Sequence, residues 1–167
     1  MNNIILIGMP GVGKSTVGVI LAKELGMQFL DSDLLIQEQE QRLLREILEQ
    51  DGVDGFLEIE ARVNASIEAE NTVIATGGSA VYSEKAMRHL RGTGTVVYLK
   101  LEYDPLAGRL GNLHNRGVVL REGQTLEELF EERQPLYEKY ADIVIDESKK
   151  DIEETLQAVF EAVKKEI

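Results

Sequence analysis

The sequence contains no cysteine, few basic residues and no long apolar segment. Without cysteine, the chain forms neither disulfides nor thiolate metal sites. Its 18 lysines and arginines are outnumbered by 30 aspartates and glutamates, which gives a net charge of −12. A nucleic-acid-binding protein needs a basic face to replace phosphate counterions, so this balance argues against that class. The simplest interpretation of the acidic excess is a solvated surface that favours solubility.

No apolar run approaches the roughly 18 residues that a membrane-spanning helix requires. The run at residues 4–7 is too short for a secretory signal, lacks a preceding basic region and continues directly into a motif. We therefore expect a cytoplasmic protein that binds neither membranes nor nucleic acid. With 43% hydrophobic and 29% charged residues, the 167-residue chain has ordinary globular composition, and we expect one domain over residues 1–167.

Short apolar runs bounded by turn residues alternate with amphipathic segments along the chain. The runs predict strands at residues 4–7, 28–30, 72–75, 95–99 and 143–145. Helices are expected over 14–25, most of 34–69 with breaks near Gly52 and Gly55, 84–90, 105–110, 125–140, and a last helix with Ile152, Leu156, Val159, Phe160 and Val163 on its core face. This alternation predicts an α/β fold with a parallel sheet and helices on both faces.

The strongest motif is the segment 8–16, GMPGVGKST, which matches GxxxxGK[ST] in full between a predicted strand and a predicted helix. Its glycines let successive backbone N–H groups point at phosphate oxygens, and the helix N-terminus adds its positive dipole end. Lys14 is expected to bridge the β- and γ-phosphates of ATP, and the Ser15 hydroxyl to ligate Mg²⁺. The predicted nucleotide-binding residues of this loop are Gly11, Val12, Gly13, Lys14, Ser15 and Thr16.

Polar clusters follow two further predicted strands, at the sheet edge where open α/β proteins bind ligands. Asp31 and Asp33 follow the second strand, where carboxylates can support magnesium and orient or deprotonate an attacking hydroxyl. They can equally cap the next helix. Gly77 and Gly78, followed by Ser79, end the third strand; paired glycines admit close approach of a phosphate or substrate oxygen, or form an ordinary turn.

Arginines mark the second half of the chain. Arg116 and Arg121 lie in the glycine-rich stretch 111–123, which we expect to be a mobile loop, and Arg109 ends the preceding helix. Arginines on a closing loop can stabilise a transferring phosphoryl group, although solvated loop charges are the alternative. Arg133 lies within a predicted helix among glutamates.

Taken in order, these motifs resemble the shikimate kinase family over nearly the whole chain. Many NTPases share the phosphate-binding loop, but the ordered set is more specific. The set consists of GMPGVGKST, Asp31-Ser32-Asp33, Gly55-Phe56 with Glu60, Ala75-Thr76-Gly77-Gly78, Arg109, Asn115-Arg116 and Arg133-Gln134-Pro135-Leu136-Tyr137.

The resemblance implies a three-layer P-loop NTPase fold with a five-stranded parallel sheet in the order 2-3-1-4-5. It implies a mobile lid over about 111–123 and an acceptor-binding helical region over about 33–62. The implied activity is transfer of the ATP γ-phosphate to the 3-hydroxyl of shikimate, a step of aromatic amino-acid biosynthesis, with Mg²⁺ as cofactor. ATP and a small hydroxylated acceptor are the expected partners, and we expect a monomer.

The resemblance also implies catalytic and nucleotide-binding roles. Asp33 matches the aspartate that binds the accepting hydroxyl and acts as base, and Asp31 matches the one that supports magnesium through water. Arg109 matches the residue that stacks on adenine. Arg116 matches the lid arginine, to which the resemblance gives both a nucleotide-binding and a catalytic role. Lys14 and Asp33 are the other expected catalytic residues.

On the acceptor side, Arg133 matches a carboxylate-binding arginine, and Gly77, Gly78 and Ser79 match the substrate-facing glycine run. Position 57 also belongs to this predicted substrate-binding set, but it is Leu57 where the family usually has an arginine that pairs with the shikimate carboxylate. The third glycine of the run is Ser79, and Gly117 replaces the usual proline of the lid.

Leu57 is the departure with the largest expected consequence. A charge-assisted hydrogen bond contributes about 1.5–3 kcal/mol, which is roughly ten- to a hundredfold in affinity. Arg133 still offers one bidentate partner to a carboxylate. Arg62 would substitute for the missing arginine only if its helix were rotated.

Two alternatives follow. The first is a related kinase for a different small hydroxylated metabolite, as Leu57 suggests. The second is a nucleotide-binding module that has lost catalysis. The joint retention of Lys14, Ser15, Asp31 and Asp33 argues against the second alternative.

Overall fold

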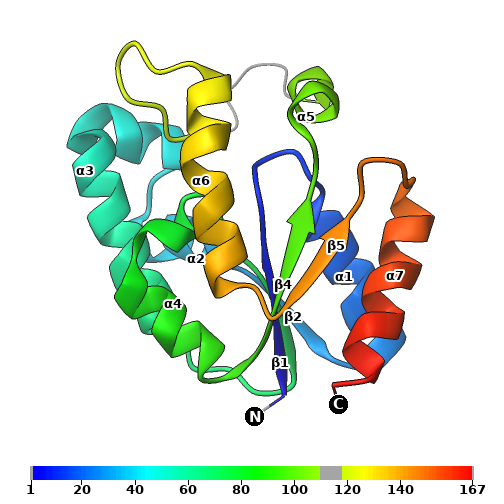
Figure 1. The fold of residues 1–167 in the computed structure, drawn as a ribbon. Helices are drawn as coiled ribbons and strands as arrows, with labels where there is room; N and C mark the ends of the chain where they lie inside the picture. Colours follow the sequence, from blue (N-terminus) through cyan, green and yellow to red (C-terminus); the bar gives the residue numbers. More distant parts are fainter. Residues whose placement is uncertain (1, 110–117, 167) are drawn as a thin grey trace.

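Five parallel strands form the centre of the molecule (Figure 1). The computed structural model describes residues 2–109 and 118–166. Its strands are β1 (Asn3–Ile7), β2 (Gln28–Asp31), β3 (Thr72–Ala75), β4 (Gly94–Lys100) and β5 (Ile143–Asp146). They pair in parallel in the order β2-β3-β1-β4-β5. The predicted fold class and strand order are confirmed.

The burial of each strand explains its sequence. Strands β1 and β3 are buried at every residue, because helices cover both faces of the parallel sheet and shield these central strands from water. Strand β5 lies at an edge, where partly buried and exposed residues alternate and Val144 is half exposed. The central strands therefore read as continuous apolar runs, which made them predictable.

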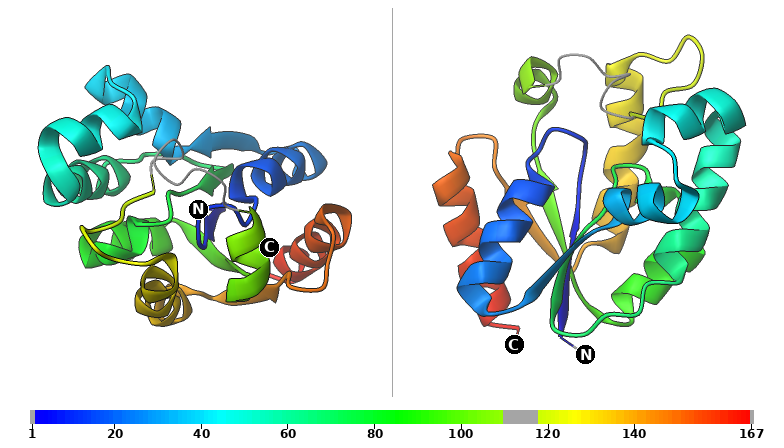
Figure 2. Two further views of the ribbon diagram at one scale, coloured as in Figure 1. Left: turned by 90° about the horizontal axis from the view of Figure 1, so that it is seen from above. Right: turned by 180° about the vertical axis from the view of Figure 1, so that it is seen from behind.

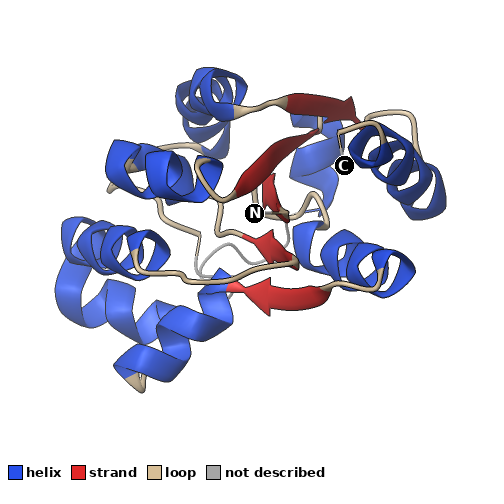
Figure 3. Cartoon of the chain, turned by 90° about the horizontal axis from the view of Figure 1, so that it is seen from below, coloured by secondary structure: helices blue, strands red, loops and turns tan. Residues whose placement is uncertain are grey.

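Helices form a layer on each side of the sheet, as Figures 2 and 3 show. On one side lie α1 (Lys14–Leu25) and α7 (Ile152–Lys164). On the other, α4 (Glu84–Arg91) and α6 (Leu126–Tyr140) contact β4, and α3 (Leu44–Ala65) packs against α4. The remaining helices are α2 (Ser32–Glu40), the single 3₁₀ turn η1 (Ala80–Tyr82) and α5 (Tyr103–Arg109). Among the described residues, no helix has both the length and the apolar character needed to cross a bilayer.

Three local predictions need correction. The segment 34–69 has a break that was not predicted, because Gln41 takes a left-handed conformation (φ 54°) that ends α2, and α3 stops at Ala65. The break at Gly52 is confirmed (φ 74°, ψ 179°), but Gly55 continues the helix, since a glycine alone does not interrupt a packed helix. Ile152 is 47% exposed because it is the first residue of α7, beyond the edge of the core.

A second apolar cluster lies apart from the main core. It joins α2 and α3 through Ile36, Ile47, Phe56 and Val63, and Val119 completes it. This cluster holds the two helices that border the acceptor side of the cavity described below.

Candidate active site

The phosphate-binding loop connects β1 to α1. Gly8, Gly11 and Gly13 have φ values of 149°, 86° and 90°, a region that L side chains rarely adopt. A Cβ atom on Gly8 would lie 2.7 Å from the carbonyl oxygen of Leu99, so the approach of the loop to β4 also requires glycine. The Lys14 ammonium donates hydrogen bonds to the carbonyl oxygens of Gly8 (2.7 Å) and Met9 (2.9 Å). The lysine therefore lies folded over the loop.

Asp31 connects the phosphate-binding loop to the start of α2. One carboxylate oxygen accepts a hydrogen bond from the Ser15 hydroxyl (2.7 Å). The other accepts from the backbone N–H of Asp33 (2.9 Å) and caps α2. Asp31 is thus a helix cap and, at the same time, a contact of the predicted magnesium ligand Ser15.

Burial at the loop shifts two pKa values toward neutrality. Burial raises the pKa of Asp33 to about 6, and the negative charge of Asp31 adds to this effect while Lys14 opposes it. Burial lowers the pKa of Lys14 to about 8, against the attraction of Asp33. At pH 7 Asp33 is ionised with a pKa close to the working pH, the condition that favours general-base catalysis.

A cavity of about 350 Å³ extends from the loop to α6. It is lined by Pro10, Gly11, Gly13, Lys14, Ser15, Thr16, Asp33, Phe56, Glu60, Thr76, Gly77, Gly78, Ser79, Val118, Val119 and Arg133. Most of the predicted site residues therefore meet in one place. Val12 and Asp31 are not in its lining; Asp31 reaches it through Ser15. Arg116 and Gly117 lie outside the described residues, and Arg109 is placed only as the last residue of α5.

Arg133 is buried beneath the glycine pair, with 1% of its surface exposed. Its guanidinium donates to the hydroxyl of Tyr82 (3.2 Å) and the carbonyl oxygen of Val119 (3.1 Å). Its third nitrogen, Nη1, lies 2.8 Å from the position that a Cβ atom would take on Gly78. Tyr137, one turn further along α6, donates to the carbonyl oxygen of Gly78 (2.6 Å). Helix α6 thus fixes an arginine against a segment that must carry glycine.

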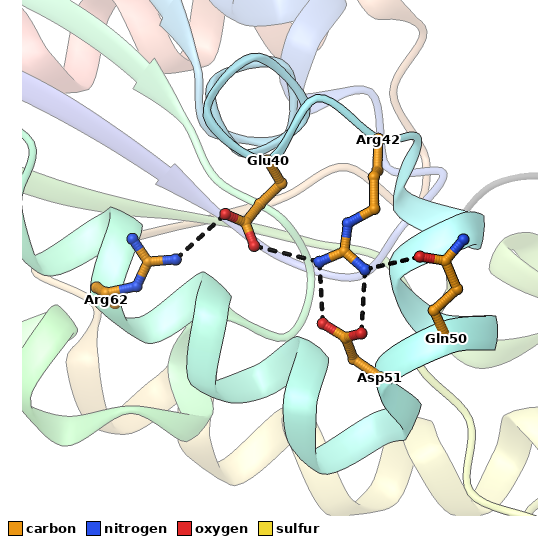
Figure 4. Close-up of polar contacts among 5 residues, drawn as sticks. All are labelled: Glu40, Arg42, Gln50, Asp51 and Arg62. Atoms are coloured by element: carbon orange, nitrogen blue, oxygen red, sulfur yellow. Dashed lines mark hydrogen bonds and ion pairs between the residues drawn. The ribbon is translucent and has the colours of Figure 1, made fainter.

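The side chains of Leu57 and Arg62 lie elsewhere. Leu57 packs on the second apolar cluster and is not in the cavity lining. Arg62 is 60% exposed and pairs with Glu40 (3.4 Å), which also contacts Arg42; Arg42 in turn makes two hydrogen bonds to Asp51 (Figure 4). Because neither Arg62 nor its partner Glu40 lines the cavity, Arg62 does not replace the missing arginine.

Glu60 lines the cavity, but the sequence analysis assigned it no role. It is 2% exposed, and one of its oxygens, Oε1, accepts a hydrogen bond from the Ser79 hydroxyl (2.6 Å). Burial raises the pKa of Glu60 to about 7, although the bond from Ser79 acts in the opposite direction. The signal was present: Glu60 falls at helical spacing between the apolar residues Phe56 and Val63, where a solvated acid is not expected.

The loop region fits a magnesium ion brought by a nucleotide. Ser15 and Asp31 place a hydroxyl and a carboxylate in contact, and oxygen donors of this kind are what Mg²⁺ prefers. Within the described ranges, no group of three or more His, Cys, Asp or Glu side chains is arranged to hold a metal.

A glycine loop between a central parallel strand and a helix, next to a partly buried carboxylate, defines a P-loop phosphotransferase. Comparison with known proteins specifies the family. The family model described as shikimate kinase matches residues 10–164. A shikimate kinase from a Sulfurihydrogenibium species is 35% identical over 99% of both chains, and one from Pseudomonas syringae is 40% identical over 87% of both. The solved shikimate kinase from Acinetobacter baumannii, in complex with shikimate, superposes with a TM-score of 0.88 at 32% identity, covering 99% of this chain and 94% of that one.

The chain therefore belongs to the shikimate kinase family, a family of ATP-dependent phosphotransferases.

Proposed function

We propose that this protein transfers the γ-phosphate of ATP to the 3-hydroxyl of shikimate, with residues 1–167 as one kinase domain. The observation that carries the proposal is the shared cavity: Asp33, ionised at neutral pH, and the loop lysine Lys14 line the same space. Membership of the family and the likeness to a relative solved with shikimate support the choice of acceptor.

The chemistry follows from these two groups. Asp33 accepts the proton of the accepting hydroxyl as its oxygen attacks the γ-phosphorus, and the bond from that phosphorus to the bridging oxygen breaks to leave ADP. Lys14 stabilises the negative charge on the phosphate oxygens. Mg²⁺, held by Ser15 and supported by Asp31, would neutralise phosphate charge when bound with the nucleotide.

The other site residues receive supporting roles in this proposal. Arg133 binds the acceptor carboxylate, and Gly77 and Gly78 let the acceptor approach the backbone closely. Arg109 stacks on the adenine, and Arg116 closes over the transferring phosphoryl group. The tight fit of Gly78 against Arg133 and Pro10 supports the acceptor-side assignment, because any side chain there would displace both.

The test is an assay of purified protein with ATP, magnesium and shikimate. We expect stoichiometric formation of ADP and shikimate 3-phosphate, detected by coupled spectrophotometry and by ³¹P NMR. A reaction without acceptor serves as the control for ATP hydrolysis. If ADP forms at the same rate with and without shikimate, the proposed activity is wrong.

Leu57 favours a second candidate, a kinase for a different small hydroxylated acceptor. Without an arginine at that position, the cavity also suits an acceptor that carries no carboxylate there. A panel of hydroxy acids and polyols at equal concentration separates the two candidates by kcat/KM. A polyol that exceeds shikimate by tenfold or more would establish the second.

A further inference from the structure

The acceptor end of the cavity contains a buried acid, Glu60, whose second carboxyl oxygen makes no hydrogen bond. Glu60 lies one helical turn after Leu57 on α3. The family resemblance described above implies an arginine at position 57 that pairs with the acceptor carboxylate. With leucine there, α3 offers that carboxylate no cation, and Arg133 on α6 is the guanidinium whose charge acts on Glu60.

Ser79 supplies the contact that Glu60 retains. It stands where the family has a third glycine, and its hydroxyl donates to Oε1 of Glu60 at 2.6 Å. Both side chains are buried, at 5% and 2% exposure, so the bond is protected from water. Because a serine hydroxyl has a single proton to donate, Ser79 is committed to Glu60 and is not itself a donor to the acceptor.

The second oxygen of Glu60, Oε2, is buried and makes no hydrogen bond. It lies 2.8 Å from the position of a Cβ atom on Gly77, and an oxygen of Asp33 lies 2.6 Å from the same position. Glu60 and Asp33 thus both have an oxygen next to the first glycine of the pair, and both residues line the cavity. An unpaired buried oxygen is destabilising unless a ligand satisfies it.

We propose that the Glu60 carboxyl, oriented by Ser79, donates a hydrogen bond from Oε2 to the acceptor carboxylate and so replaces the arginine absent at position 57. Glu60 is then a specificity-determining residue and Ser79 a positioning residue. The inference rests on the proposed function, because it assumes an acceptor that carries a carboxylate. Arg133, with its Nη1 directed at Gly78, is the second donor to the same carboxylate.

Burial of Glu60, aided by the charge of Asp33, supports a protonated carboxyl. Burial raises its pKa to about 7, Asp33 on α2 raises it further, and Ser79, Arg133 on α6 and Lys14 on α1 lower it. Tyr137, the other titratable group of α6 here, is neutral because burial raises its pKa to about 12. Below pH 7 the neutral acid can donate; above pH 7 the carboxylate repels the acceptor carboxylate. A carboxylic acid kept neutral so that it can donate is an established device in enzymes.

The consequence is an affinity for shikimate that depends on pH. Glu60 must be protonated to donate, so it supports acceptor binding below about pH 7. We expect the KM for shikimate to rise above that pH. At pH 8 about one tenth of Glu60 is protonated, so the KM for shikimate rises about tenfold relative to pH 6.

The first test compares the wild type with Glu60→Gln over pH 5.5–8.5. The glutamine amide donates at every pH, so we expect the tenfold rise in shikimate KM to disappear. Glu58→Gln, an exposed position on the same helix, is the matched control and should retain the rise. If Glu60→Gln shows the same rise as the wild type, or if the wild-type KM is flat from pH 6 to 8, the inference is wrong.

The second test uses Ser79→Ala, which remains informative if the glutamine variant does not fold. Ser79 has helical backbone angles (φ −90°, ψ 0°) that alanine also adopts. Losing its hydrogen bond should raise the shikimate KM roughly three- to tenfold. It should also move the midpoint of the KM rise to higher pH, because that bond favours the ionised form. An unchanged midpoint and KM would contradict the positioning role.

These outcomes are separate from failure of the proposed function. If no shikimate 3-phosphate forms at any pH, the acceptor assignment fails and the inference fails with it. If the product forms but the shikimate KM depends on pH in the same way in the wild type and in Glu60→Gln, only the inference fails.

Discussion

The two ends of the cavity are built in different ways. The phosphate end uses consecutive residues, 8–16, whose glycine backbone and one folded lysine form the site. The acceptor end uses side chains from separate elements: Asp33 on α2, Glu60 on α3, Ser79 at η1 and Arg133 on α6. The phosphate end keeps the complete loop motif. The acceptor end, by contrast, differs at Leu57 and Ser79 from the pattern that the family resemblance implies.

The difference shows which part of a kinase can change. Backbone N–H groups cannot be substituted by mutation, and every nucleotide presents the same phosphates, so the loop is constrained as one unit. Side-chain donors can be exchanged one at a time if a neighbour compensates. The pair formed by Glu60 and Ser79 has the properties of such a compensation.

The largest effect should come from the phosphate end. Replacing Lys14 by alanine removes the buried ammonium that contacts Gly8 and Met9, and we expect kcat/KM to fall by about 10³-fold or more for ATP and shikimate alike. Steady-state kinetics measure the loss, and circular dichroism checks the fold. Lys23→Ala, exposed near the other end of α1, is the control. A folded Lys14→Ala protein within tenfold of wild type would contradict the assignment.

Asp33→Ala should impair catalysis without impairing ATP binding. Removing the base should lower kcat by roughly 10²–10⁴-fold while ATP still binds, because the loop is untouched. In the wild type, protonation of Asp33 should lower kcat about tenfold for each pH unit below its pKa of about 6. Calorimetric titration with a non-hydrolysable ATP analogue measures the binding, and Glu153→Ala on α7 is the control. Near-normal turnover in Asp33→Ala would remove the base assignment.

Leu57→Arg should restore the family arrangement at the acceptor end. The new guanidinium should lower the shikimate KM roughly ten- to a hundredfold. It should also hold the adjacent Glu60 ionised and lower its pKa, so that the rise in KM above pH 7 is lost. Leu57→Met, which keeps an apolar side chain of similar volume, should leave both quantities within about twofold of wild type. No gain in affinity would indicate a cavity adapted to another acceptor.

The smallest effect is expected at Arg62. Its exposed pair with Glu40 contributes about 0–1 kcal/mol to stability. Arg62→Ala should therefore change kcat and shikimate KM by less than about twofold, while chemical denaturation shows at most a small loss of stability. A large rise in shikimate KM would mean that this arginine, and not Glu60, serves the acceptor.

Much of the fold was predictable because its signals are local. The five strands are short apolar runs with turn residues at their ends, and the loop motif lies between the first strand and its helix. The helical region 34–69 was less predictable. Its interruption at Gln41 depends on how α2 and α3 pack through the second apolar cluster, and no glycine or proline marks the position.

By itself, the sequence determined the class of reaction and predicted where the nucleotide phosphates bind, because residues 8–16 are contiguous and their conformation depends mainly on their own backbone. Only the tertiary structure decided how the acceptor end is built. It buried Arg133 under Gly78 across 55 residues of chain and brought Glu60 against Ser79 across 19. Burial then gave Glu60 a pKa near 7, which no local pattern encodes, since desolvation depends on everything packed around a group.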